Sequence, residues 1–115
     1  MSDLVLYGLK TCDTCKKAMK ALEAAGTPAR LVDIRAEADL AAKVPQWLAA
    51  AGAKTLVNTR STTWRSLSDA ERAKADAGET ETLLIANPTL IKRPVIESGT
   101  DVFVGWTTET QSALL

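Results

Sequence analysis

The sequence predicts a single α/β domain, and three features of its pattern support that prediction. Residues 3–34 alternate between strand and helix signals, the middle of the chain has helical periodicity, and two short apolar runs near the end indicate a β-hairpin. The chain has 115 residues, of which 46% are hydrophobic and 24% are charged, as in ordinary globular proteins. One domain of residues 1–115 is therefore expected.

The N-terminal part predicts a β-α-β unit. Residues 3–8, DLVLYG, have the pattern of a short buried strand. From Cys12 onward apolar residues recur at three- and four-residue steps, and Gly26 followed by Pro28 indicates the end of that helix. Residues 29–34, ARLVDI, form a second candidate strand. Because a helix connects the two strands, they should be parallel, with a right-handed crossover.

The middle of the chain predicts a helical insert of about residues 37–87. Helices are expected at residues 37–52, 68–78 and 79–86. Pro45 should mark either a first-turn position or a break in the first of these helices. Residues 55–67 are expected to be loop-like, with short turns.

The C-terminal part predicts a hairpin and a closing helix. Residues 94–96 and 102–104 are apolar runs on either side of ESGTD, and residues 107–115 fit a short helix. The full order is then β-α-β, a helical insert and β-β-α. This order matches a thioredoxin-like architecture, with a mixed four-stranded sheet and helices on its faces.

Charge and hydropathy exclude several classes of function. Lys and Arg number 14, as do Asp and Glu, so the basic excess of a protein that binds nucleic acid directly is missing. No apolar run approaches the roughly 18 residues that a membrane span needs. The segment MSDLVLYGLK lacks the features of a secretory signal. We therefore expect a cytoplasmic protein without a membrane or nucleic-acid partner.

Both cysteines of the chain, Cys12 and Cys15, form a C-x-x-C motif within LYGLKTCDTCKKA. Such a pair can bind a metal, form a structural disulfide, fill a core or exchange electrons. A zinc site lacks ligands here, because there is no histidine and no further cysteine, so no metal is expected. Structural disulfides are rare in the cytoplasm, and the polar neighbours of the pair argue against an inert core position. A redox role is favoured.

The position of Cys12 at the start of a helix predicts its chemistry. The free N–H groups of the first turn and the helix dipole stabilise a thiolate there, which should lower the pKa of Cys12. Lys10, Lys16 and Lys17 add positive charge nearby. Cys15 lies three residues further on, on a neighbouring part of the same face. We therefore expect Cys12 to attack a substrate and Cys15 to resolve the mixed intermediate.

The segments YGLKTCDTCKKAMKALEAAG, IKRPVI and VGW together resemble the ArsC/Spx family, most closely its YffB-like branch. The resemblance extends from Tyr7 to about Trp106. It implies a thioredoxin-like fold with a helical insert. Members of the family include glutaredoxin-coupled arsenate reductases, proteins regarded as glutathione-dependent thiol reductases, and regulators that bind RNA polymerase.

The resemblance also implies roles for individual residues. Pro94 takes the place of the cis-proline that faces the active cysteine in thioredoxin-like folds. Arg93 takes the place of an arginine that binds an oxyanion beside that cysteine, and a guanidinium would equally suit a glutathione carboxylate. Arg60 resembles a second family arginine, with Arg65 as a competitor for that role. The expected catalytic residues are Cys12, Cys15 and Arg93. The expected substrate-binding residues are Lys10, Thr11, Arg60 and Pro94.

Three functions follow from the resemblance. The favoured one is a thiol–disulfide oxidoreductase with no bound cofactor, which uses glutathione as co-substrate and glutathione or a glutaredoxin-type protein as reductant. The second is an Spx-like regulator that docks on an RNA polymerase subunit and uses the cysteine pair as a redox switch. The third is an arsenate reductase. Two departures weaken the third: Cys15 is present where those enzymes have a single-cysteine design, and no basic residue follows Arg93.

Overall fold

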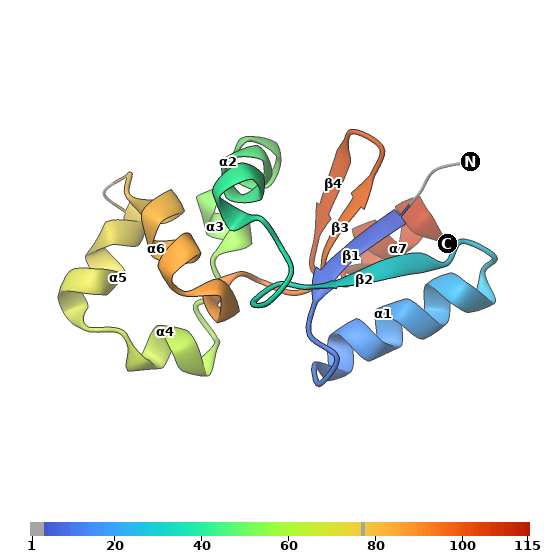
Figure 1. Ribbon diagram of the computed structural model, residues 1–115, viewed down its shortest axis with the longest axis horizontal. Coiled ribbons are helices and arrows are strands. Elements are labelled where there is room, and N and C mark those ends of the chain that lie inside the picture. Colours follow the sequence, from blue (N-terminus) through green and yellow to red (C-terminus); the bar gives the residue numbers. More distant parts are fainter. Residues whose placement is uncertain (1–3, 77) are drawn as a thin grey trace. The chain divides into compact units, whose positions relative to one another are not determined.

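The computed structural model describes residues 4–76 and 78–115 and divides into two compact units (Figure 1). One unit contains the chain up to Ala38 together with Arg93–Leu115, and the other contains Asp39–Lys92. The second unit holds the predicted helical insert, which extends to Lys92 rather than to about residue 87. That the two units constitute a single domain stays a prediction.

The first unit is built on a mixed four-stranded sheet, as predicted. Its strands are β1 (Leu4–Gly8), β2 (Ala29–Asp33), β3 (Val95–Ser98) and β4 (Asp101–Val104). Their order in the sheet is β2-β1-β3-β4, so that β1 lies between β2 and β3. β1 is parallel to β2 and antiparallel to β3, and β3 is antiparallel to β4. The register places Leu6 opposite both Leu31 and Ile96.

Helix α1 (Asp13–Ala24) packs on this sheet through a stripe of small and aliphatic residues. Cys15, Ala18 and Leu22 recur at three- and four-residue steps, and all three are buried. They form one apolar cluster with Leu6 and Ile96 of the sheet. The cysteine motif therefore lies at the start of a helix that this cluster holds against the sheet.

Helix α7 (Thr108–Leu114) closes the unit, and Leu114 packs against the same cluster as α1. The Oγ1 of Thr107 accepts a hydrogen bond from the Thr110 N–H at 3.2 Å, which caps the start of α7. The short C-terminal helix expected at residues 107–115 is thereby confirmed. Both helices lie on the face of the sheet that carries Leu6 and Ile96.

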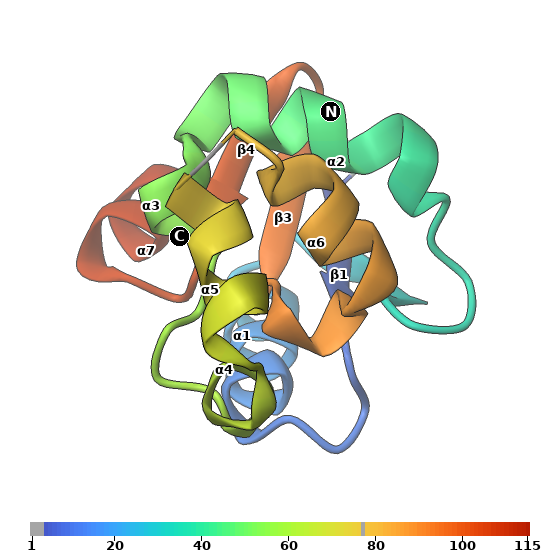
Figure 2. The same cartoon turned by 90° about the vertical axis from the view of Figure 1, so that its left-hand side faces the viewer.

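The described residues of the second unit are mostly helical, with one isolated antiparallel β-bridge between Val57 and Ile91. Its elements are α2 (Leu40–Ala51), α3 (Ala53–Leu56), α4 (Thr62–Ser66), α5 (Asp69–Asp76), α6 (Thr80–Ala86) and the 3₁₀ turn η1 (Pro88–Leu90). Figure 2 labels the helices α2 to α6 of this unit. Trp47 of α2 is completely buried, as is Leu84 of α6. These two helices contact one another and supply much of the unit's apolar interior.

Two local expectations for this unit were wrong. Helix α2 runs through Pro45, although a first-turn position or a break was expected. Proline removes the hydrogen bond to the carbonyl four residues earlier, here that of Ala41. Both residues are exposed, so water can satisfy the freed carbonyl and the helix continues.

The segment expected to be loop-like, residues 55–67, contains the end of α3 and all of α4. The Oγ of Ser61 accepts a hydrogen bond from the Trp64 N–H at 3.1 Å and caps α4. A serine cap can start so short a helix only where the rest of the unit holds it, which local periodicity does not reveal. No helix of the described residues combines the length and apolarity needed to cross a bilayer.

Candidate active site

The two cysteines lie where the loop after β1 passes into α1. Cys12 is the residue before the helix, in an extended conformation, and its carbonyl accepts a hydrogen bond from the Lys16 N–H at 3.0 Å. Its own N–H donates to the Leu9 carbonyl at 3.1 Å, which closes the turn that leads into the helix. Both cysteines are free thiols, Cys12 partly exposed and Cys15 buried. The predicted helix-start position of Cys12 is confirmed.

The surroundings of Cys12 favour its thiolate. Burial acts against the charge and raises the pKa of Cys12, but hydrogen bonds from the backbone and thiol of Cys15 and from Arg93 outweigh it. The positive charge of Arg93 acts in the same direction, and the pKa of Cys12 lies below its usual range. Cys12 is consequently the stronger nucleophile of the pair at neutral pH.

The surroundings of Cys15 have the opposite effect. Burial, and to a lesser extent the neighbouring Cys12 sulfur, raise the pKa of Cys15 to about 11, against a smaller lowering effect of the Leu9 backbone. Cys15 therefore keeps its proton and can donate it to the Cys12 thiolate. Of the two thiols, Cys12 is therefore the one that ionises at the lower pH.

Gly8, the last residue of β1, makes room for the Cys15 sulfur. A Cβ atom added to Gly8 would overlap with the Sγ of Cys15. The Gly8 carbonyl accepts a hydrogen bond from the Ile34 N–H at 3.0 Å, which holds this end of the strand in the sheet. The sequence predicts Gly8 only as the end of a strand, and no local signal identifies it as a residue of the site.

The opposite wall of the site is formed by Arg93 and Pro94, directly before β3. The Arg93–Pro94 peptide bond is cis, as the family resemblance predicts. Pro94 is buried, and its carbonyl accepts a hydrogen bond from the Gly105 N–H at 2.7 Å. Arg93 hydrogen-bonds to the Cys12 sulfur, so residues about eighty positions apart in the chain meet here.

The remaining predicted site residues lie at exposed positions of the two units. Lys10 and Thr11 are exposed in the loop that precedes Cys12. Arg60 and Arg65 belong to the second unit, where both are exposed. Their predicted roles in substrate binding therefore stay predictions.

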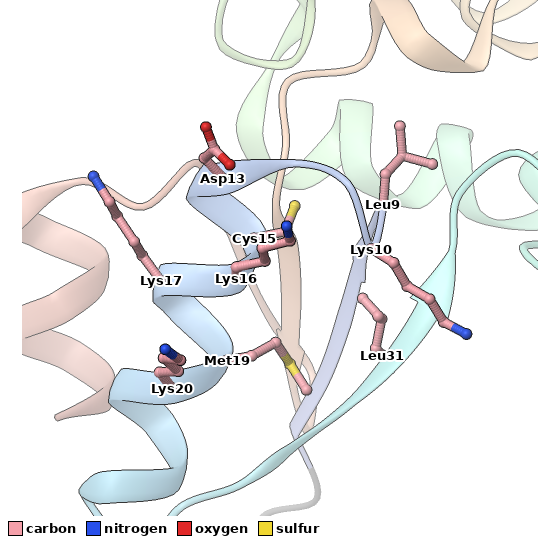
Figure 3. A pocket seen from close by; sticks show the side chains of 9 residues that line it. All are labelled: Leu9, Lys10, Asp13, Cys15, Lys16, Lys17, Met19, Lys20 and Leu31. Atoms are coloured by element: carbon pink, nitrogen blue, oxygen red, sulfur yellow. The ribbon is translucent and has the colours of Figure 1, made fainter.

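A pocket of about 560 Å³ lies beside Cys15 and was not expected from the sequence (Figure 3). Leu9, Met19 and Leu31 supply its apolar lining, and Met19 and Leu31 point toward one another between α1 and the sheet. Lys10, Lys16, Lys17 and Lys20 surround it, and we call it the lysine pocket. Cys15 lines this pocket, whereas Cys12 is not among its lining residues.

The chain is similar to several known proteins. The model of the ArsC family matches residues 7–114. An uncharacterized protein of Haemophilus influenzae is 37% identical over 103 residues, 90% of either chain. The solved structure of the YFFB (PA3664) protein is 35% identical, covers 97% of this chain and 98% of its own, and superposes with a TM-score of 0.86. The solution structure of an arsenate reductase (ArsC) related protein from Brucella melitensis is 32% identical over 96% of this chain and 92% of its own, with a TM-score of 0.76.

Proposed function

The chain belongs to the ArsC family of arsenate reductase-like proteins, and on this premise we propose that it is a glutathione-dependent thiol–disulfide oxidoreductase. The observation that carries the proposal is the opposite direction of the two thiol pKa shifts. Cys12 favours the thiolate and Cys15 favours the protonated thiol. A nucleophile beside a protonated resolving thiol is the arrangement that two-step disulfide exchange requires.

In the first step, the Cys12 thiolate attacks the glutathione sulfur of a mixed disulfide between glutathione and a substrate thiol. The substrate–glutathione S–S bond breaks, a bond between Cys12 and glutathione forms, and the substrate leaves as a thiolate that takes a proton from water. The charge and hydrogen bond of Arg93, which stabilise the Cys12 thiolate, are then free to bind an anionic group of glutathione.

In the second step, Cys15 attacks the Cys12 sulfur and gives its proton to the departing glutathione. The products are a Cys12–Cys15 disulfide and one glutathione thiol. Two further glutathione thiols, or a glutaredoxin-type protein, reduce that disulfide and restore the starting state. With glutathione as reductant, one mixed disulfide and one glutathione are converted to one substrate thiol and one oxidised glutathione per cycle.

Mass spectrometry of the reduced protein mixed with oxidised glutathione tests the proposal. The native protein should form a glutathione adduct on Cys12 that converts to an internal disulfide. Cys15→Ser should stop at the adduct, and Cys12→Ser should react no faster than a model thiol. If neither cysteine of the native protein reacts faster than a model thiol, the proposal is wrong.

Two further measurements test the two alternative functions. With arsenate as the substrate and glutathione as the reductant, glutathione would be consumed only if the protein were an arsenate reductase. Arg93 beside Cys12 suits an oxyanion, but no lysine or arginine follows it in the sequence to supply further positive charge. Docking on an RNA polymerase subunit stays a prediction, which co-purification with the purified polymerase would test.

A further inference from the structure

We propose that the lysine pocket is a second binding site, for a small organic anion with an apolar body and one acidic head group. The site adjoins the proposed disulfide exchange through Cys15, which lines the pocket, but it includes neither Cys12 nor Arg93. The proposal rests on the size of the pocket, its apolar lining and the charges around it.

The size and lining of the pocket suit a small molecule. Ligand sites in proteins have volumes of about 300–1,000 Å³ and are mostly apolar with a few polar groups at defined positions. The lysine pocket, at about 560 Å³, lies within that range. Met19 and Leu31 are half-buried and point toward one another, so an apolar body placed between them would cover side chains that now face solvent (Figure 3).

The charges around the pocket specify an anion. Four lysines line it against one carboxylate, that of Asp13. Lys16 and Lys20 are one helical turn apart on α1, while Lys10 extends from the loop on the strand side (Figure 3). The charge of Lys10 is shared with Asp33, whose carboxyl pKa is lowered mainly by backbone hydrogen bonds from Ala36 and Arg35, with Lys10 contributing.

The charges of α1 are not compensated in the same way. Throughout residues 4–76 and 78–115, no carboxylate forms an ion pair with Lys16, Lys17 or Lys20. An acidic head group on the rim would therefore meet ammonium groups that have no competing partner in this part of the chain. An inorganic anion would gain only the attraction to the ammonium groups, and a neutral apolar molecule only the free energy of burying apolar surface. A molecule with both an acidic group and an apolar body gains both and therefore fits best.

Binding of anilinonaphthalene sulfonate, followed by its fluorescence and by amide NMR shifts, tests the proposal. This probe has an apolar ring system and one sulfonate, and phenylnaphthylamine is its uncharged counterpart. The shifts should be confined to the loop at Leu9 and Lys10, to α1 and to Leu31. Added salt should weaken binding of the sulfonate but not of the neutral compound, because exposed charges are screened.

Variants then separate the charge from the apolar lining. Each exposed lysine should contribute about two- to fivefold in affinity. The double variant Lys16→Gln, Lys20→Gln should therefore bind the sulfonate probe about tenfold more weakly than the native protein. Lys74→Gln, on the exposed side of α5, is the matched control and should change nothing. Met19→Glu should abolish binding, whereas Met19→Leu should preserve it. Cys12→Ser should also bind normally, since Cys12 does not line the pocket.

Two results would overturn the proposal. One is NMR shifts that map to the second unit or spread over the whole chain. The other is equal affinity of the native protein and the double lysine variant, when the amide spectrum shows that the variant is folded. Dodecanoate should compete with the sulfonate for the site, and dodecanol should compete more weakly. Equal competition by the two would mean that the pocket does not select for charge.

Discussion

The backbone of Gly8 lies directly against the sulfur of Cys15, so closely that a side chain of any size at Gly8 would displace it. Cys15 is thereby held between the end of β1 and the first turn of α1, with 1% of its surface exposed. This contact fixes the Cys15 thiol beside Cys12, and it explains why a glycine ends the strand that leads to the candidate site.

The first prediction concerns this contact. Gly8→Ala should destabilise the protein by about 1–3 kcal/mol, because an extra methyl group must be accommodated in a filled interior. Urea denaturation measures the change. In a Cys15→Ala background the same substitution should cost much less, since the overlapping sulfur is gone. An equal cost in both backgrounds would mean that the strain arises elsewhere, for example at the Leu6 side chain.

The second prediction concerns Arg93. Arg93→Gln should raise the pKa of Cys12, because it removes a charged hydrogen bond to the thiolate. A hydrogen bond to a charged group is worth about 1.5–3 kcal/mol, part of which water replaces, so alkylation of Cys12 by iodoacetamide at neutral pH should slow about tenfold. Arg93→Lys should recover part of the rate. Arg30→Gln, at an exposed position of β2, should leave it unchanged.

The third prediction concerns the pH dependence of stability. The pKa of Cys15 is raised on folding from 9.0 to about 11, mainly by burial. A group with a raised folded pKa contributes stability that is complete below its unfolded pKa and is lost as the pH rises through the folded value. The reduced protein should therefore lose stability between pH 9.0 and about 11. Cys15→Ser should lack this loss of stability. The free energy of unfolding of both proteins is measured by urea denaturation at each pH, and the difference between them separates the effect of Cys15 from the titration of the lysines.

The low pKa of Cys12 has the opposite consequence. A group with a lowered folded pKa contributes stability above its unfolded pKa, and this contribution is lost as the pH falls through the folded value. The free energy of unfolding of Cys12→Ser, plotted against pH, should therefore diverge from that of the native protein on the acidic side of the usual thiol range. A divergence only on the basic side would contradict the assignment of the thiolate to Cys12.

The fourth prediction concerns Arg72 in the second unit. Its Nε donates to the Trp64 carbonyl at 3.1 Å, one of its terminal amino groups donates to the Arg65 carbonyl at 2.9 Å, and its guanidinium lies 5.9 Å from the Trp64 ring centroid. These contacts satisfy the last carbonyls of α4 and connect that helix to α5. Arg72→Met keeps the apolar stem but should destabilise the unit by about 1–2 kcal/mol. Lys74→Met is the control, and tryptophan fluorescence reports the unfolding.

Local signals in the sequence were sufficient for much of the fold. Alternating and helical apolar patterns located β1, β2, α1 and the terminal hairpin to within one or two residues. They failed for α3 and α4, which are too short to have a period and form because the rest of the second unit holds them. They also failed at Pro45, where exposure of the neighbouring carbonyl allows the helix to continue.

The sequence by itself determined which residues are the candidates for the chemistry. A C-x-x-C motif at a helix start, without histidine or further cysteine, indicates a redox pair with Cys12 outermost. Only the tertiary structure decided how the lowered and the raised pKa are divided between the two sulfurs. That division depends on burial of Cys15 and on the hydrogen bond from Arg93, and both arise from contacts between residues distant in the chain. The space at Gly8 and the lysine pocket have the same origin, because a cavity or a close approach is a property of packed elements and leaves no pattern along the sequence.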